Sequence, residues 1–204
     1  IARAEGELEL ARGLFTQVGD MASDVSQRDW ARLNAATILA EQGQLDDAFF
    51  ALREVSAKTS DPEVVLQAQL GMASVYQEKG SFKKALELLD GVNAEGLGPA
   101  WSASLTQSRV ACDLSEGETQ RAVSRWNELL RRFSDHDEAA SQAKIGLGEI
   151  ALLEGRTADA IGFFSSVAQA SEDRFFRAQA EIGWGKSLVA DGKRLQAADR
   201  LEAV

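Results

Sequence analysis

The chain has 204 residues, with 32 acidic against 22 basic side chains, a formal net charge of −10 and a hydrophobic content of 45%. The acidic excess argues against nucleic acid as a partner, because nucleic-acid binding depends on lysine and arginine neutralising phosphates. No apolar run approaches the roughly 18 residues of a membrane-spanning helix, so we expect no direct membrane insertion.

A fixed repeat length is the most informative feature of the sequence. Glycine recurs at positions 6, 43, 80, 117, 155 and 192, with spacings of 37, 37, 37, 38 and 37 residues. Alanine stands five positions after each of them, as Ala11, Ala48, Ala85, Ala122, Ala160 and Ala197. A constant spacing in this range is typical of helical repeat arrays, in which each repeat contacts only its neighbours.

In chain order, residues 1–26 are expected to form the trailing helix of a preceding repeat. Large apolar residues stand 9 and 12 positions after each glycine, on the same helix face as the alanine. A second apolar stripe precedes each glycine from Gly43 onward, so each repeat is predicted to be a pair of helices. The pairs cover 27–61, 62–98, 99–135, 136–173 and a truncated 174–204, in one solenoid over 1–204. Because the pattern starts and stops in mid-helix, the chain reads as part of a longer protein.

Local signals indicate where helices end and begin. Each glycine from Gly43 onward stands where a first helix ends, the usual place for a left-handed cap. Asp61 before Pro62 predicts the start of the next first helix, because a capping side chain there precedes proline in the first turn. Ser134-Asp135 and the segment from Ser171 to Asp173 are expected to cap the later first helices.

The repeat at 99–135 departs from this pattern. Its first helix places Gln107, Arg109 and Asp113 where other repeats have apolar groups. One interpretation is a rotated helix, whose apolar stripe runs from Trp101 to Leu114. The other is a polar notch that serves a ligand, with Arg109 and Asp113 paired on one face because they are four residues apart.

Few residue combinations point to chemistry. The only histidine, His136, lies among acidic residues and indicates a solvated helix start, because a metal site needs several ligands in fixed geometry. The only cysteine, Cys112, excludes an intrachain disulfide, and without a basic partner it fits a packing residue. Gly185-Lys186-Ser187 lacks the upstream glycine and strand of a phosphate-binding loop. We therefore predict no catalytic residue, no metal, no cofactor and no enzymatic activity.

One repeat carries Leu70, Gly71, Ala73, Tyr76, Gly80, Phe82, Ala85 and Leu89, and another carries Leu147, Gly148, Gly155, Ala160 and Phe164. This framework resembles the tetratricopeptide repeat family over nearly the whole chain. The resemblance implies an all-α fold, a right-handed superhelical solenoid of antiparallel helix pairs. The spacing exceeds the family's usual unit of roughly 34 residues. In this it is similar to repeats of bacterial cell-envelope proteins, which implies the periplasm or envelope as location, with the cytoplasm as the alternative.

In this family the first helix of each pair lines a concave groove that takes peptides or partner helices. Carried onto this chain, the groove residues are Trp30, Leu33, Gln67, Leu70, Ser74, Gln107, Gln142, Ile145, Glu149, Gln179, Ile182 and Lys186. Lys186 is the only basic residue among them, which argues against recognition of a partner's C-terminal carboxylate. Aliphatic and amide side chains suit an extended segment or an amphipathic helix better.

The resemblance implies a non-enzymatic scaffold that binds a peptide or helix of a partner protein in this groove. The alternative is a regulatory or targeting region of a larger enzyme, or of an envelope secretion or assembly machine. The ends of the array are expected to expose apolar faces, which offer a route to a homo-oligomer.

Overall fold

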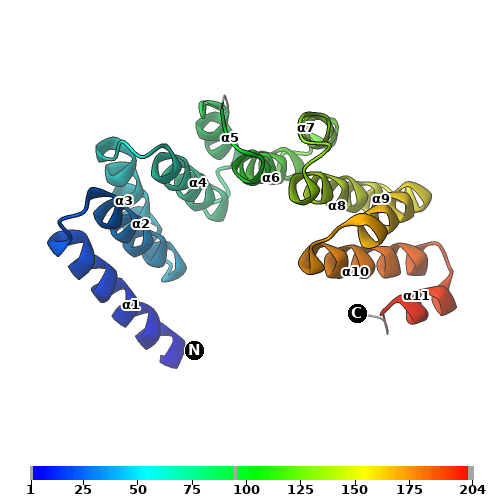
Figure 1. Cartoon of the computed structure of the whole chain (residues 1–204), viewed down its shortest axis with the longest axis horizontal. Coiled ribbons are helices and arrows are strands. Elements are labelled where there is room, and N and C mark those ends of the chain that lie inside the picture. The colour runs from blue at the N-terminus through cyan, green and yellow to red at the C-terminus, as the bar shows by residue number, and fades with distance from the viewer. Residues whose placement is uncertain (1, 94–95, 202–204) are drawn as a thin grey trace. The chain divides into compact units, whose positions relative to one another are not determined.

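The computed structural model describes residues 2–93 and 96–201, with side chains for 6–93 and 96–200, and all regular structure in these ranges is helical (Figure 1). The helices are α1 Ala2–Met21, α2 Val25–Glu41, α3 Leu45–Lys58, α4 Pro62–Glu78, α5 Phe82–Asp90, α6 Pro99–Ser115, α7 Thr119–Arg132, α8 Asp137–Leu153, α9 Thr157–Ala170, α10 Arg174–Ala190 and α11 Arg194–Leu201. They form two compact units, residues 1–93 with α1 to α5 and residues 94–204 with α6 to α11.

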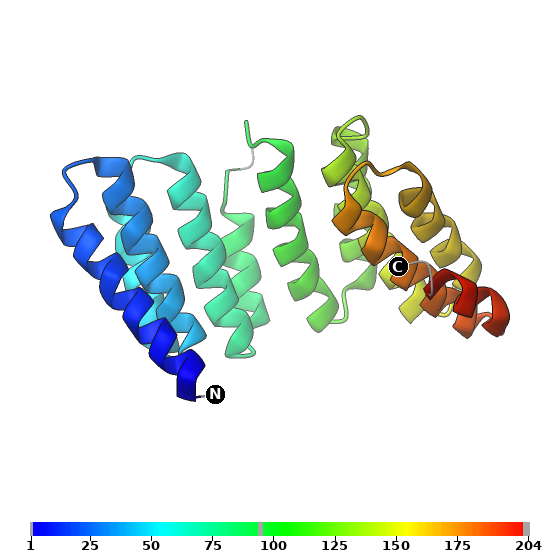
Figure 2. The ribbon, with the colours of Figure 1, turned by 60° about the horizontal axis from the view of Figure 1, so that its bottom comes forward.

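Within each unit, consecutive helices run in opposite directions and lie side by side (Figure 2). In the first unit α2 contacts α1, α3 and α4, and in the second unit α8 contacts α6, α7, α9 and α10. The expected all-α fold of antiparallel helix pairs is confirmed. None of the helices in the described ranges is both long and apolar enough to cross a membrane.

Five glycines end the first helix of a pair in the same way, as predicted. Gly43, Gly80, Gly117, Gly155 and Gly192 have φ values from 67° to 80°, which glycine adopts at little cost. The Gly43 N–H donates to the Ala40 carbonyl at 2.8 Å, and the Gln44 N–H donates to the Leu39 carbonyl at 2.9 Å. This pair of bonds is a Schellman motif, and it recurs at the other four glycines. Gly6 differs, because α1 continues through it.

Helix starts follow the predicted capping at two places and depart from it at a third. Asp61 before α4 and Asp173 before α10 each accept a hydrogen bond from a first-turn N–H, at 2.9 and 2.6 Å. The prediction for Ser134-Asp135 is wrong, because α8 begins only at Asp137. The His136 N–H closes a turn onto the carbonyl of residue 133 at 3.1 Å, and this turn delays the helix start.

Close contact between successive helix pairs explains the spacing of the small residues. Ala48, Ala85, Ala122 and Ala160 are each fully buried. The large residues nine positions after a repeat glycine pack on a glycine of the next first helix, Leu52 on Gly71, Trp126 on Gly146 and Phe164 on Gly183. A Cβ atom at Gly146 would lie 2.3 Å from Nε1 of Trp126, so only glycine fits this contact.

Candidate functional site

The predicted groove residues all lie on first helices of pairs, which are covered on several sides. Helix α8 packs against four neighbours, and ten of its 17 residues are buried. The second helix α3 packs against only two neighbours and buries three residues. A first helix therefore leaves a narrow strip of surface free, and that strip decides which predicted residues can reach a partner.

In the first unit the predicted residues lie on α2 and α4. Leu33 is 3% exposed and belongs to the hydrophobic core, against which the half-buried Trp30 packs. Gln67 and Leu70 are half-buried, and Ser74 is exposed. Leu33 is therefore closed to a partner, and the accessible groove side chains of this unit are the other four.

In the second unit the predicted residues lie on α6, α8 and α10, and several of them meet. Gln107, Glu149, Gln179, Ile182 and Lys186 are exposed, Gln142 is half-buried, and Ile145 is only 7% exposed. A pocket of about 270 Å³ is lined by Gln107, Trp126, Gln142, Ile145, Gly146, Glu149, Phe175, Phe176 and Gln179. We call this pocket the groove pocket. Ile182 and Lys186 lie outside its lining.

Amide and aromatic groups shape the groove pocket. The Gln142 amide Nε2 donates to Oε1 of Gln107 at 2.7 Å, which links α8 to α6. Phe175 and Phe176 stack edge to face with ring centroids 5.5 Å apart, and Phe175 is 63% exposed. The absence of a side chain at Gly146 lets the Trp126 ring reach the pocket wall. The pocket thus offers apolar surface beside hydrogen-bonding groups, a combination typical of ligand sites.

Sequence reasoning missed Phe175 as a site residue, although a signal was available. The residues at the same place in the other repeats are Ser26, Glu63, Ala100 and Glu138. An aromatic residue at a position that is otherwise small or polar is not needed for the repeat fold. Such a departure from the repeat pattern makes Phe175 a candidate binding residue.

Glu149 and Lys186 give the groove surface its local charge. Partial desolvation raises the pKa of the Glu149 carboxyl above its ordinary value of 4.5, and the Lys186 ammonium opposes that shift. Lys186 stands 37 residues later, at the equivalent position of the next repeat. A cationic group of a ligand placed beside Glu149 would offset its desolvation.

The buried carboxylate of Asp113 has partners that sequence reasoning did not identify. Asp113 is fully buried on α6, and Arg121 and Arg125 of α7 each place a guanidinium nitrogen 2.6 Å from one of its oxygens. Because both arginines lie on one face of α7, one turn apart, they grip the carboxylate from the neighbouring helix. Asp113 therefore ties the two helices of its pair together, while Gln107 faces the groove pocket.

Cys112 and His136 do not belong to any cluster of potential metal ligands in the described residues. Cys112 is buried and His136 is exposed at the N-cap position of α8. In the described part of the chain, no group of three or more histidine, cysteine or carboxylate side chains could hold a metal ion.

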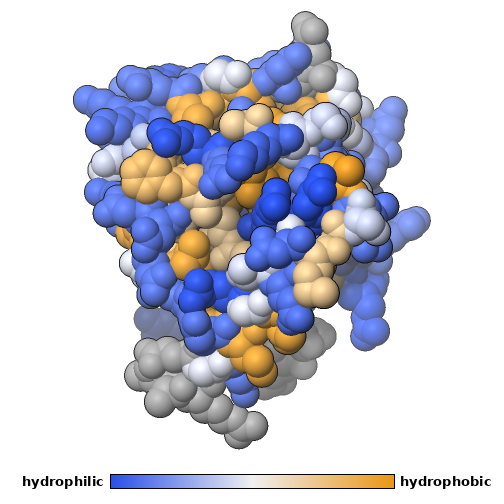
Figure 3. Space-filling model, turned by 90° about the vertical axis from the view of Figure 1, so that its left-hand side faces the viewer, coloured by the Kyte–Doolittle hydropathy of each residue, from blue (hydrophilic) through white to orange (hydrophobic). Residues whose placement is uncertain are grey.

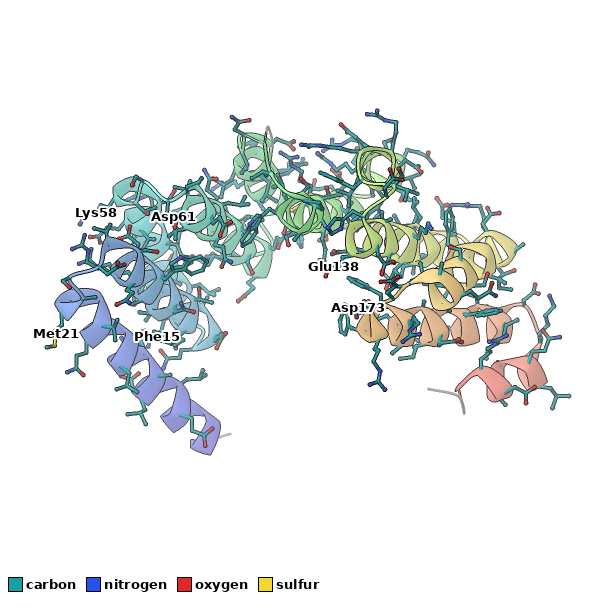
Figure 4. The ribbon with its side chains drawn as sticks, in the orientation of Figure 1. Phe15, Met21, Lys58, Asp61, Glu138 and Asp173 are labelled. Atoms are coloured by element: carbon teal, nitrogen blue, oxygen red, sulfur yellow. The ribbon has the colours of Figure 1, made fainter. Side chains whose placement is uncertain are left out.

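Helix α1 carries five exposed apolar side chains. They are Leu10, Leu14, Phe15, Val18 and Met21, which are 66%, 55%, 36%, 45% and 75% exposed. Figure 3 looks onto the side of the first unit that carries α1 and shows apolar groups scattered among charged ones. In Figure 4, Met21 points away from the neighbouring helices at the end of α1.

Two family models match the sequence of this chain. A family model described as a tetratricopeptide repeat-like domain matches residues 2–109, and a tetratricopeptide repeat model matches residues 113–174. No curated protein sequence matches the chain.

Solved structures share the fold at low sequence identity. BtubC (BKLC) from P. vanneervenii is 15% identical with a TM-score of 0.75, over 96% of this chain and 89% of that one. The repeats of a putative kinesin light chain from Podosopora anserina are 20% identical with a TM-score of 0.63, over 86% and 92%. MamA protein is 16% identical with a TM-score of 0.52, over 94% and 88%. These structures are similar in fold alone.

Proposed function

The chain belongs to the tetratricopeptide repeat family, and we propose that it acts as a non-enzymatic scaffold that binds another protein. Repeats of this family are generally non-catalytic scaffolds. An extended segment of the partner binds in the groove pocket of the second unit. The observation that carries this proposal is the cluster of exposed Phe175, Gln179 and Gln107 around one pocket on the first helices.

The lining of the groove pocket favours an extended peptide with an apolar anchor. Phe175 and the ring of Trp126 supply apolar surface, and large aromatic groups dominate binding energy at protein interfaces. The amides of Gln107, Gln142 and Gln179 can donate to and accept from the backbone of an extended segment. Glu149 and the net charge of −10 favour a partner segment with basic character, chiefly by speeding its association.

The test is selection of peptides from a random displayed library, followed by affinity measurement on defined variants. Binding is followed by intrinsic tryptophan fluorescence, to which Trp126 of the pocket lining contributes beside Trp30, Trp101 and Trp184. The double variant Phe175→Ala, Gln179→Ala should weaken a selected peptide by about tenfold or more, because an aromatic anchor contributes at least ~1.4 kcal/mol.

The matched control removes an equally exposed aromatic ring elsewhere. Phe50 on α3 is 56% exposed and lies outside the groove pocket, so Phe50→Ala should leave the affinity unchanged. Helicity of each variant is checked by circular dichroism. If selected peptides bind the double variant as tightly as the native chain, the groove pocket is not the binding site.

A further inference from the structure

A second pocket lies in the first unit, between helices α1, α2 and α3. It measures about 320 Å³, at the lower end of the range for ligand sites. Small side chains from α2 and α3 form its floor, among them Ala35, Ala36 and Ala51, while charged side chains stand around them. We call this space the α1–α3 pocket.

The α1–α3 pocket exists because one repeat position is occupied by a small residue. Eight positions before the repeat glycine this repeat has Ala35, where the others have Met72, Arg109, Leu147 and Trp184. Met72 and Leu147 are buried at 5% and 4% exposure, so a large side chain fills this place in their repeats. Alanine leaves it empty.

The same pocket holds a second departure from the repeat pattern. Fourteen positions before the repeat glycine this repeat has Asp29, where the others have Leu66, Ala103, Ser141 and Ala178. Asp29 lines the α1–α3 pocket and is only 7% exposed. Among the described residues, none forms a hydrogen bond or ion pair with its carboxylate. Its oxygens are not among the buried side-chain atoms that lack a hydrogen-bond partner, so they are open to the space in the pocket.

Two of the three cations that line the pocket pair with other acids. Arg12 pairs with Glu9 at 2.5 Å, and Lys58 pairs with Glu54 at 2.5 Å. The hydrogen bond from Lys58 is the main cause that lowers the pKa of Glu54, and the charge of Arg32, which also lines the pocket, adds a smaller effect. Figure 4 shows Lys58 at the end of α3. Asp29 is the buried carboxylate of the pocket lining, at 7% exposure.

We propose that the α1–α3 pocket binds an ammonium or guanidinium group, which pairs with Asp29 above the floor of alanines. The stem of a lysine or arginine side chain from a partner protein, or a free polyamine, fills the volume that Ala35 leaves. A cation paired with a buried carboxylate through charge-assisted hydrogen bonds is the arrangement that offsets its burial. The site lies wholly in the first unit, so it stands independently of the groove pocket.

The experiment is an NMR titration of the ¹⁵N-labelled chain with four probes. Nα-acetyl-arginine methylamide and Nα-acetyl-lysine methylamide present the two charged side chains, and spermidine presents the free polyamine. Nα-acetyl-citrulline methylamide has nearly the shape of the arginine probe without its charge. The charged probes should shift the amide signals of Asp29, Ala35 and Ala36 in a saturable way, and the citrulline probe should not. Tighter binding of spermidine than of both blocked amino acids would identify a free polyamine as the source of the cation.

Three variants test the assignment. Asp29→Asn should weaken the best charged probe by about tenfold or more, the size expected for a lost charged hydrogen bond. Asp47→Asn removes an exposed carboxylate of α3 that lies outside the pocket lining, and it should leave the affinity unchanged. Ala35→Leu fills the space with the residue that stands at 147 and should abolish binding while the helix signals persist.

Equal binding of the citrulline probe, or no localised shift with any charged probe, would overturn the proposal.

Discussion

Replacing Gly146 with alanine tests the packing of successive helix pairs most directly. In an exposed helix interior, Gly→Ala stabilises by about 1 kcal/mol, because alanine is the better helix former. At Gly146 the new Cβ would lie 2.3 Å from Nε1 and 2.4 Å from Cε2 of Trp126. Since Trp126 is 4% exposed and surrounded by core side chains, its ring has little room to move. Overpacking costs about 1–3 kcal/mol, so after the gain in helix propensity we expect a net loss of up to about 2 kcal/mol.

Gly162→Ala is the matched control for this substitution. Gly162 lies inside α9, and a Cβ there would meet no atom within 4 Å. This variant should gain up to about 1 kcal/mol from helix propensity alone. Urea unfolding, followed by far-ultraviolet circular dichroism and by tryptophan fluorescence, measures both changes. If the two variants shift the unfolding midpoint in the same direction by the same amount, the inferred contact between Gly146 and Trp126 is absent.

Two further predictions concern carboxylates of the second unit. Asp113→Asn should destabilise the chain by about 1–3 kcal/mol in urea unfolding, because the hydrogen bonds from Arg121 and Arg125 lose their charged acceptor. Asp159→Asn removes only an exposed pair and should change little, so equal losses would refute the structural role of Asp113. Burial would raise the pKa of Asp137, but hydrogen bonds from the Ser171 hydroxyl and the Glu172 N–H outweigh it and lower the pKa below 3.8. The stability gained from Asp137 is therefore complete above pH 3.8 and is lost as the pH falls through the lower folded pKa, so the gap between native chain and Asp137→Asn in thermal melts should close in acid; a gap that does not depend on pH would contradict this.

The helical repeats could be read from the sequence because their signals are local. The left-handed cap at Gly43 depends on residues within one turn, and so do the caps made by Asp61 and Asp173. The turn at Ser134-Asp135 misled the same reasoning, because a capping side chain also favours turns. The spacing of the apolar residues predicted which face of each helix would be apolar.

The candidate site was predicted only in part, because neighbouring helices bury some of the predicted residues. Five of the predicted groove residues line the groove pocket. Leu33 and Ile145, two of the predicted groove residues, are only 3% and 7% exposed. A helix with several neighbours buries most of its circumference, and the sequence does not state which neighbour covers which side. Phe175 was missed because its position is not part of the repeat pattern. Only the packing of α6, α8 and α10 shows that it lines the pocket.

The sequence by itself indicated the helix pairs, the glycine caps that end the first helices and two of the helix starts, since each of these depends on residues close together in the chain. Only the tertiary structure decided which polar residues find partners. Asp113 on α6 meets two arginines from α7, while Asp29 on α2 meets no described partner in its pocket. The free-energy cost of a buried charge depends on whether an oppositely charged or hydrogen-bonding group lies beside it. The packing of neighbouring helices decides which group that is.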